Sequence, residues 1–287
     1  MLVPLSLLTF FTLAQCRTTV PPMHRPTFST TSPTHNHNHT TRHERESIAV
    51  LRALQTNESH PFHVINPHHY TQHDLVVADG LAGLLAFQKF AVGANATVQK
   101  HRVFQDGNHV FLHMQYDLLG PLVSFDVFRF EHDRIVEHWD NLQTPSNGIN
   151  GTNKNGHTML DGPVGPSHHH ETARNKEIVR NYIRDFRNQT LAPTYFNGLI
   201  QHNPTLADTY QAWEWYVLAP NVTYFETIHK VLGEGDFVLV MSEGDYYGTA
   251  TGFYDLFRLE NGLIVEHWDT MQAIPPKADW KNPNGKW

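Results

Sequence analysis

Two aspartates begin a stretch of residues that occurs twice in this chain. The first copy, DVFRFEHDRIVEHWD, runs from Asp126 to Asp140, and the second, DLFRLENGLIVEHWD, runs from Asp255 to Asp269. The copies lie 129 residues apart and share their Asp, Arg, Glu, His and Trp positions, so the chain contains a duplicated domain. In each copy the leading carboxylate falls among Phe and aliphatic residues, where a charge costs free energy unless it has a use. Asp126 and Asp255 are therefore the first candidate proton-transfer groups.

Each copy is typical of a β-hairpin. Hydrophobic residues flank a polar two-residue turn, which in the second copy is Asn261-Gly262, a strong signal for a tight hairpin. If the first copy has the same two-residue turn and regular cross-strand pairing, Asp126 lies opposite Trp139 and both side chains share one face of the sheet. His138 and Asp140 then point to the other face. They reach the face of Asp126 only if a β-bulge intervenes.

The predicted elements follow the same order in both halves of the chain. Helical periodicity appears after Glu44 and again before Phe87, and in the second half at 177–186 and 213–216. Four strand-like runs follow the helices in each half, and those of the first half lie at 96–104, 110–117, 122–130 and 134–143. The sequence therefore predicts an α+β fold of two tandem domains, each with N-terminal helices packed on a curved antiparallel β-sheet. A sheet that curves over helices encloses a pocket.

Composition divides the chain into five segments. Residues 1–16 resemble a secretory signal peptide, because a short apolar run precedes small residues, and that run is too short to span a bilayer. Residues 17–43 are rich in Thr, Pro and His and are predicted to be a disordered linker. The first domain is expected at 44–146, a second linker at 147–170 and the second domain at 171–287. A secreted protein is the expectation.

Charge and glycosylation motifs narrow the kinds of partner. A net charge of -7 and a pI near 6.3 argue against binding to nucleic acid, and no membrane partner is expected. A single cysteine excludes an intrachain disulfide. Six N-x-Ser/Thr motifs predict glycosylation, although a sequence rich in Asn and Thr also produces such motifs by chance. They lie at Asn38, Asn57, Asn95, Asn150, Asn188 and Asn221.

The repeated motifs resemble the SnoaL-like polyketide cyclase family, within the nuclear transport factor 2-like superfamily of cone-shaped α+β domains. The matching signatures are Gln-His-Asp at 72–74 and Gln-His-Asn at 201–203, His-Arg-Val at 101–103 and His-Lys-Val at 229–231, Asp-hydrophobic-Phe-Arg, and Ile-Val-Glu-His-Trp-Asp. The resemblance covers nearly everything from Glu44 to Trp287. It implies a pocket for a small hydrophobic carbonyl compound and acid/base chemistry by an aspartate, with no metal and no organic cofactor. Because this superfold hosts many chemistries, the resemblance does not name the reaction.

Carried onto this chain, the resemblance assigns the proton transfer to Asp126 and Asp255. Four histidines are candidates to bind or polarise the carbonyl group: His73, His202, His138 and His267. The candidates for substrate binding are Trp139, Trp268, Phe128, Phe257, Asp140 and Asp269. Each candidate also has a purely structural alternative. Asp126 and Asp255 could be buried aspartates that only accept hydrogen bonds, and the histidines of the Gln-His motifs could cap a helix. The tryptophans could belong to the core, and each His-x-Asp pair could lie at an interface.

The expected function is that of a cofactor-independent cyclase, isomerase or dehydratase acting on a small hydrophobic carbonyl compound. The two domains are expected to pack sheet to sheet as a pseudo-dimer within one chain. A non-catalytic carrier of a small apolar ligand is the main alternative, and an extracellular interaction module that uses the sheet face with His138 and Asp140 is another. If one pocket is degenerate, the first is the better candidate, because its turn lacks Asn-Gly and the segment before Tyr70 is short.

Overall fold

A computed structural model describes residues 40–145, 148, 151–152 and 154–287 of the protein. The predicted signal peptide, most of the linker at 17–43, and the motifs at Asn38 and Asn150 lie outside the described residues. Within the described part of the chain, no helix has the length and apolar character needed to cross a membrane.

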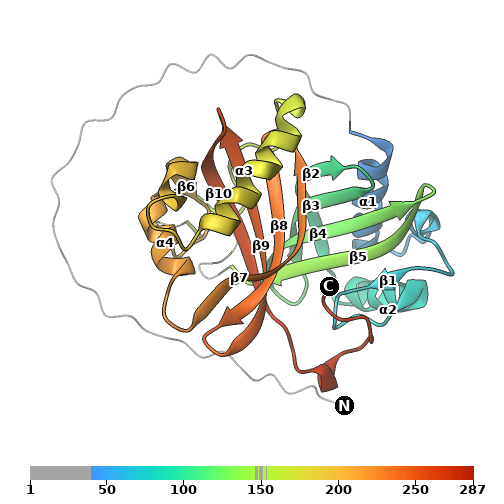
Figure 1. The fold of residues 1–287 in the computed structure, drawn as a ribbon. Coiled ribbons are helices and arrows are strands. Elements are labelled where there is room, and N and C mark those ends of the chain that lie inside the picture. The colour runs from blue at the N-terminus through green and yellow to red at the C-terminus, as the bar shows by residue number, and fades with distance from the viewer. Residues whose placement is uncertain (1–39, 146–147, 149–150, 153) are drawn as a thin grey trace. The chain divides into compact units, whose positions relative to one another are not determined.

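The first half of the described chain places its helices before the four antiparallel strands of a five-stranded sheet, and a short edge strand lies between the two α-helices in sequence (Figure 1). Its helical elements are α1 (Arg42–Arg52), η1 (Ala53–Gln55), η2 (His60–Val64) and α2 (Gly80–Gly93), and its strands are β1 (Thr71–Gln72), β2 (Thr97–Asp106), β3 (His109–Asp117), β4 (Pro121–Glu131) and β5 (Arg134–Gln143). The strand order is β1-β5-β4-β3-β2. β1 pairs parallel to β5, and the other neighbours are antiparallel.

The second half repeats this arrangement. Its helical elements are η3 (His169–Glu171), α3 (Thr172–Asp185), η4 (Ala192–Tyr195), α4 (Tyr210–Val217) and η5 (Lys277–Asp279), and its strands are β6 (Phe196–Gln201), β7 (Val222–Glu234), β8 (Phe237–Tyr246), β9 (Thr249–Glu260) and β10 (Leu263–Ala273). The strand order is β6-β10-β9-β8-β7, again with a parallel edge pair. The predicted fold class of two tandem α+β domains is confirmed. The parallel edge strands β1 and β6, which carry the Gln of each Gln-His motif, were not predicted.

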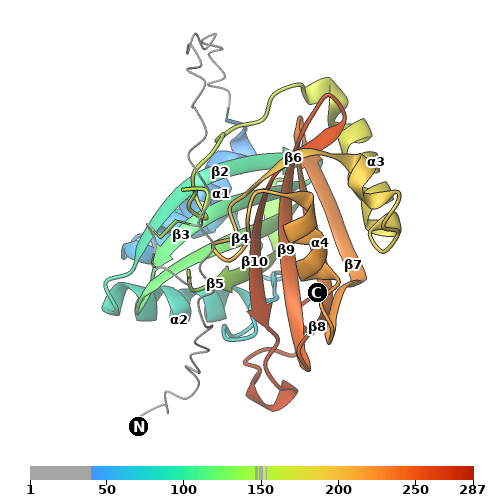
Figure 2. The ribbon, with the colours of Figure 1, turned by 90° about the vertical axis from the view of Figure 1, so that its left-hand side faces the viewer.

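One face of each sheet packs against its own helices (Figure 2). In the first half, Leu51 of α1 and Leu84 of α2 belong to the same buried apolar cluster as Phe128 of β4. In the second half, Trp213 of α4 belongs to a cluster with Phe257 of β9. Apolar side chains recur at helical spacing in α1 and α3, so each of these helices buries one side on its sheet.

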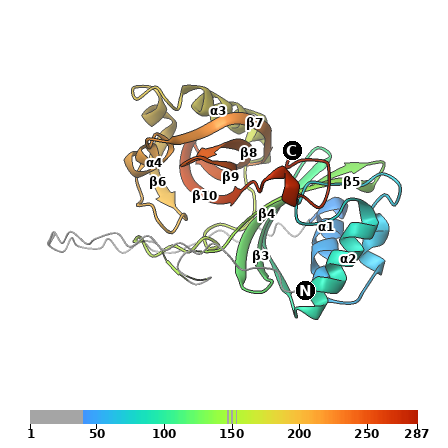
Figure 3. The ribbon, with the colours of Figure 1, turned by 90° about the horizontal axis from the view of Figure 1, so that it is seen from below.

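The opposite faces of the two sheets share a third apolar cluster. Phe104 and Trp139 of the first sheet lie in it together with Phe237 and Trp268 of the second. The rings of Phe104 and Phe237 have centroids 4.8 Å apart. Figure 3 shows α1 and α2 on the side of the first sheet that faces away from the second sheet. Each sheet is therefore buried on both faces.

The start of α1 is fixed by a reciprocal pair of hydrogen bonds. The backbone N–H of Glu44 donates to the Thr41 hydroxyl at 3.1 Å, and the backbone N–H of Thr41 donates to the Glu44 carboxylate at 2.5 Å. This capping box satisfies two backbone donors that the first helical turn leaves without partners.

Replacing Thr41 with Ala is expected to lower the free energy of unfolding by about 1 kcal/mol, because the cap acceptor is lost. Chemical denaturation of the full chain measures the change, and Thr41→Ser, which keeps the hydroxyl, serves as the control. A Thr41→Ala midpoint equal to that of the wild type would show that the cap does not stabilise α1.

The hairpin turns of the two repeats have the same backbone conformation despite their different residues. Both turn residues have positive φ in each copy, at 48° and 59° for His132 and Asp133, and at 52° and 79° for Asn261 and Gly262. A type I′ turn requires positive φ at both positions. His132-Asp133 therefore forms the turn that Asn-Gly predicts for the second copy.

The pairing beyond these turns differs from the regular register expected from the sequence. In the first copy Phe130 pairs with Ile135, but Arg129 pairs with Glu137, so Val136 is an extra residue and forms a β-bulge. The second copy has the same irregularity between Ile264 and Glu266. The bulge shifts every later residue to the other face.

The expected pairing of Asp126 with Trp139 is therefore wrong. Asp126 pairs with Asp140, Phe128 pairs with His138, and Trp139 pairs with Val127. The sequence required a β-bulge for Asp126 and His138 to share a site, and the structure contains that bulge.

Candidate functional site

Asp126 is the centre of a buried hydrogen-bond network on the helix side of the first sheet. His138 Nε2 lies 3.1 Å from Asp126 Oδ1, while the hydroxyls of Ser124 and Tyr116 donate to Oδ2 at 2.6 and 3.0 Å. Only 3% of Asp126 is exposed. Strands β3, β4 and β5 supply these groups, and the β-bulge in β5 turns His138 toward the aspartate.

The partners of His138 favour its doubly protonated form. Its Nδ1 lies 3.0 Å from Gln72 Oε1, and the same oxygen accepts the backbone N–H of Asp74 at 3.0 Å. The amide oxygen therefore faces the ring, so Nδ1 donates to it while Nε2 donates to Asp126. Burial acts to lower the pKa of His138, but the hydrogen bond with Asp126 and the charges of Asp140, Asp126 and Asp74 raise it overall. Asp126 and His138 thus lie at the distance of an ion pair, and the carboxylates around the ring favour its protonated form.

A second pair of carboxyl groups, Asp74 and Asp140, lies beside the first. Burial, followed by the charge of Asp140, raises the pKa of Asp74 to about 7, and the nearby ammonium of Lys286 opposes this rise. Lys286 Nζ donates to the backbone oxygen of Asp140 at 2.6 Å and lies 3.4 Å from its Oδ1. Near neutral pH, Asp74 is thus poised between its acid and carboxylate forms.

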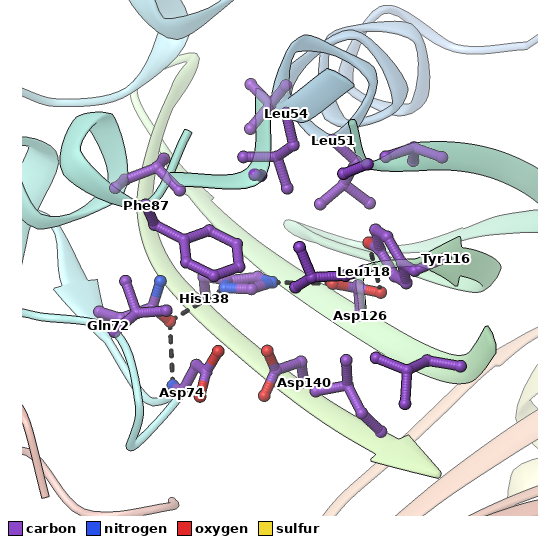
Figure 4. Close-up of a pocket in the computed structure, with 18 of the residues that line it drawn as sticks. Leu51, Leu54, Gln72, Asp74, Phe87, Tyr116, Leu118, Asp126, His138 and Asp140 are labelled. Carbon is purple, nitrogen blue, oxygen red and sulfur yellow. Dashed lines mark hydrogen bonds and ion pairs between the residues drawn. The ribbon is translucent and has the colours of Figure 1, made fainter. Parts of the chain in front are cut away.

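Asp74, Asp126, His138 and Asp140 line one end of a cavity of about 50 Å³ in the first domain (Figure 4). The rest of the lining is apolar and comes from α1, α2 and the sheet, including Leu51, Leu54, Leu84, Phe87, Leu118 and Phe128. Such a space admits several water molecules or a small organic group. A ligand with an apolar body and one polar end matches the lining.

The second domain contains the same central network. His267 Nε2 lies 3.0 Å from Asp255 Oδ1, and His267 Nδ1 lies 2.9 Å from Gln201 Oε1. The hydroxyl of Tyr224 donates to Asp255 Oδ1 at 2.9 Å. Asp255 and His267 are both fully buried. The duplication has thus preserved the aspartate, the histidine and the glutamine in both sheets.

Aromatic side chains occupy the space around the second network. Trp213 corresponds in the repeat to Leu84, which lines the first cavity, because the two residues lie 129 positions apart. The ring centroid of Trp213 lies 4.3 Å from that of His267. Tyr224 packs against Trp213 and Phe253 in the same cluster. The first domain, which the sequence marked as the better candidate for degeneracy, contains this cavity, whereas aromatic rings pack around His267 in the second domain and Asp255 is fully buried.

The histidine of the second network has its pKa shifted in the direction opposite to that of His138. Burial raises the pKa of Asp255 to about 8 and lowers the pKa of His267 to about 4. Burial also raises the pKa of Asp269 to about 6. Asn203, which lies at the position of Asp74, donates its side-chain amide to Asp269 at 2.7 Å. The second Asp–His pair is therefore neutral at neutral pH.

Trp139 and Trp268 lie away from these networks, in the cluster between the two sheets. The bulge is the physical reason, because it turns each tryptophan to the face opposite His138 or His267. Their predicted place in the wall of the pocket is thus corrected. Phe128 does line the cavity, whereas Phe257 belongs to the filled aromatic cluster.

His73 and His202 also lie on the tryptophan side. His73 stacks on Trp139 with ring centroids 4.9 Å apart, and its Nε2 is 2.9 Å from Glu137. His202 stacks on Trp268 at 4.4 Å, and its Nε2 is 2.8 Å from Glu266. Neither ring is bonded to Asp126 or Asp255, so the expectation that these histidines lie in the pocket is corrected.

Each Gln-His loop is held by a segment that follows the sheet of the other domain. Asn284 donates its side-chain amide to the Gln72 backbone oxygen at 2.9 Å and to Asp79 at 2.7 Å. Asn155 donates in the same way to the Gln201 backbone oxygen at 3.1 Å and also to Asp208. The two asparagines lie 129 positions apart, and each precedes a glycine. Sequence reasoning missed these residues, although the repeated Asn-Gly was a usable signal.

Among the described residues, three groups of side chains bring possible metal ligands within 4.8 Å of one another: Asp126, His138 and Asp140; Asp255, His267 and Asp269; and His157, Asp161 and His202. In the first group both ring nitrogens of His138 already have partners. Both ring nitrogens of His202 likewise face oxygen atoms. We assign no metal to these groups, and the expected absence of a metal and of an organic cofactor stays a prediction.

Comparisons with known proteins give structural likenesses only. No known family profile and no curated protein matches the chain. IdmH from Streptomyces antibioticus, described as "a putative polyketide cyclase", is 15% identical, with 36% of this chain and 93% of that chain covered and a TM-score of 0.32. The epoxide hydrolase/cyclase-like enzyme SalBIII is 14% identical, with 36% and 93% covered and a TM-score of 0.30. An NTF2-like protein from Mesorhizobium loti is 18% identical, with 36% and 94% covered and a TM-score of 0.30.

Each of these likenesses concerns about a third of this chain. The SnoaL-like and NTF2-like resemblance implied helices before a curved sheet, and in both halves the two α-helices precede the four antiparallel strands, while the edge strands β1 and β6 lie between the helices in sequence. This arrangement of helices and strands occurs twice in the chain.

Proposed function

We propose that the first domain is a cofactor-independent acid/base catalyst that acts as a cyclase, isomerase or dehydratase on a small hydrophobic carbonyl compound. The observation that carries this proposal is the buried, hydrogen-bonded Asp126–His138 pair at the polar end of an apolar cavity. Carboxylates near neutral pH remove protons next to carbonyl groups when the site excludes water and holds the substrate close.

In this proposal Asp126 transfers the proton, and its neighbours hold it in place. Tyr116, Ser124 and His138 donate to its two oxygens and fix the direction of the carboxylate. The apolar residues of α1 and α2 hold the body of the substrate. A proton leaves the carbon next to the carbonyl group, and its bonding electrons move toward the carbonyl oxygen.

The second domain has a structural role in this proposal. Its Asp255–His267 pair is uncharged and enclosed by aromatic rings, so it stabilises the core and does not meet a substrate. We propose that the two domains form a pseudo-dimer within the chain, since apolar residues of both sheets share one cluster. The catalytic role expected of Asp255 and His267 is not part of this function.

A carrier of a small apolar ligand is the second candidate function. It is favoured by the three donors that already satisfy Asp126 and by the predominantly apolar lining of the cavity. The interaction module has less support, because only 6% of His138 and 5% of Asp140 are exposed. These two residues cannot present a surface to a protein partner in this conformation.

We also propose that the protein is a secreted glycoprotein. Four of its six glycosylation motifs lie in the described part of the chain, and the asparagine of each is exposed. They are Asn57, Asn95, Asn188 and Asn221. Exposure is what the attachment of a glycan requires.

Mass spectrometry of small molecules that copurify with the protein tests the proposed function. The wild type is purified and extracted in parallel with Asp126→Asn, and Asp255→Asn serves as the matched control. A compound that accumulates only in Asp126→Asn is a stalled substrate and supports an enzyme. The same unchanged compound in all three proteins supports the carrier, and the lack of any bound compound in all three weighs against both functions.

A further inference from the structure

The segment 281–287 reaches the first-domain site from beyond the second sheet. The backbone N–H of Lys281 donates to the Leu75 backbone oxygen at 2.8 Å. The side-chain amide of Asn282 donates to the backbone oxygens of Asp74 and Val77 at 2.7 and 2.9 Å. The loop that carries Asp74 is thus held by a segment distant in sequence.

Lys286 of this segment contributes a buried ammonium group. Only 5% of the residue is exposed, and Nζ donates to Gln272 Oε1 at 2.6 Å as well as to the backbone oxygen of Asp140. A buried cation costs free energy unless opposite charges lie near it. Asp140, whose Oδ1 lies 3.4 Å from Nζ, and Asp74 in its carboxylate form supply those charges.

Asp74 has a position suited to proton transfer. Its residue lines the cavity together with Asp126 and Asp140, and Figure 4 shows the Asp74 and Asp140 carboxyl groups at the same end of the site. Asp74 Oδ1 accepts the backbone N–H of Val76 at 3.0 Å, which orients the carboxyl group. The described hydrogen bonds of the proposed mechanism do not use this carboxyl group.

The second domain lacks both parts of this arrangement. The repeats are offset by 129 positions, and at this offset Asn203 of the second domain corresponds to Asp74 of the first. At the same offset, His157 corresponds to Lys286. The aspartate, histidine and glutamine of the central network are unchanged between the domains. The domain with the cavity is therefore the one that has the additional carboxyl group and the buried ammonium.

We propose that Asp74 is the proton donor that complements Asp126 in the first-domain cavity, and that Lys286 is the residue that positions it. This inference rests on the proposed function. Asp126 takes a proton from the carbon next to the carbonyl group, the C–H electron pair forms a carbon–carbon double bond, and the carbonyl oxygen takes a proton from Asp74. Return of a proton from Asp126 to a carbon and of the enol proton to Asp74 restores both groups, so no co-reactant is consumed.

The charged and titratable groups facing Asp74 set the pH dependence of this step. They are Asp140 and His138 of β5, Lys286 of the segment 281–287, and Tyr70 before β1. Asp74 donates only when protonated, so the rate falls as the pH rises through its pKa of about 7. Lys286 lowers this pKa, and its removal therefore moves the fall in rate to higher pH.

The test follows uptake of deuterium from D2O by cyclohexanone, at the carbon next to its carbonyl group, across a range of pH. Asp74→Asn is expected to slow uptake roughly 10²-fold and to remove the fall near neutral pH. Lys286→Met is expected to move that fall to higher pH, and Lys286→Arg is expected to restore it. Lys281→Met, which removes an exposed charge from the same segment, is the matched control and is expected to leave the pH dependence unchanged.

A second readout needs no substrate. Carbon NMR of the Asp74 carboxyl group is expected to show a higher titration midpoint in Lys286→Met than in the wild type, while chemical-shift dispersion confirms folding. A midpoint that does not move overturns the role of Lys286. If Asp126→Asn abolishes deuterium uptake and Asp74→Asn does not slow it, this inference is wrong and the proposed function stands. Equal uptake in the wild type and Asp126→Asn contradicts the proposed function itself.

Discussion

Replacing Asp126 with Asn is expected to slow deuterium uptake at the carbon next to a bound carbonyl group by about 10²–10⁴-fold, the contribution typical of a positioned acid or base. The amide keeps the size of the side chain but cannot take the proton. The same substitution removes the hydrogen bond and the charge that raise the pKa of His138, so that pKa is expected to fall. Proton NMR measures both quantities, one on the ketone and one on the imidazole ring.

The matched control is Asp255→Asn, which makes the same change in the filled second site. Its deuterium uptake is expected to equal that of the wild type, because Asp255 is fully buried and the rings of Trp213 and Phe257 pack against its partner His267. A loss of uptake in Asp255→Asn and not in Asp126→Asn would place the chemistry in the second domain and contradict the proposed function. A fall in the pKa of His138 without any change in uptake would support a carrier, since the ion pair would then exist without catalysis.

Replacing Asp255 with Asn is expected to stabilise the protein at alkaline pH and to change its stability little at acidic pH. Burial raises the pKa of Asp255 from 3.8 to about 8, so the folded protein holds a proton that the unfolded chain releases. The stability from this proton is fully present below the unfolded pKa and is lost as the pH rises through the folded pKa. The asparagine variant has no such loss. Its advantage over the wild type grows by up to about 1.4 kcal/mol for each pH unit in this window.

Urea denaturation of the wild type and Asp255→Asn at pH 4, 6 and 8 measures this difference in the free energy of unfolding. Asp126→Asn is the comparison in the first domain, where the variant removes the carboxylate partner of the buried His138 and is expected to destabilise the protein at neutral pH. A stability difference for Asp255→Asn that stays constant from pH 4 to 8 would show that Asp255 is not protonated in the folded protein.

The repeat, the order of elements and the tight turns could be predicted from the sequence because each depends on local residue patterns. Asn261-Gly262 identified a turn that His132-Asp133 also adopts. The bulge could not be predicted in the same way. Val136 has the character of an ordinary strand residue, and nothing local marks it as the residue without a cross-strand partner.

That single residue decides which candidates form the site. Because the pairing shifts at Val136, His138 and Asp140 join Asp126, and Trp139 leaves it. Which of the two domains contains a cavity depends on contacts between residues distant in sequence. In the second domain, Trp213 of α4 packs against His267 of β10. The sequence therefore identified the repeated chemical groups but not their final neighbours.

The attachment of segment 281–287 has a consequence for how the protein is made. A ribosome produces the first sheet, ending at Gln143, well before it produces Lys286, and domains generally begin to fold in the order of synthesis. Until Lys286 arrives, the Asp74–Asp140 pair lacks its buried cation, and the loop at Asp74 lacks the amide of Asn282. The domain that is translated first is therefore completed last, and its pocket acquires its final charge balance only after the second sheet has been synthesised.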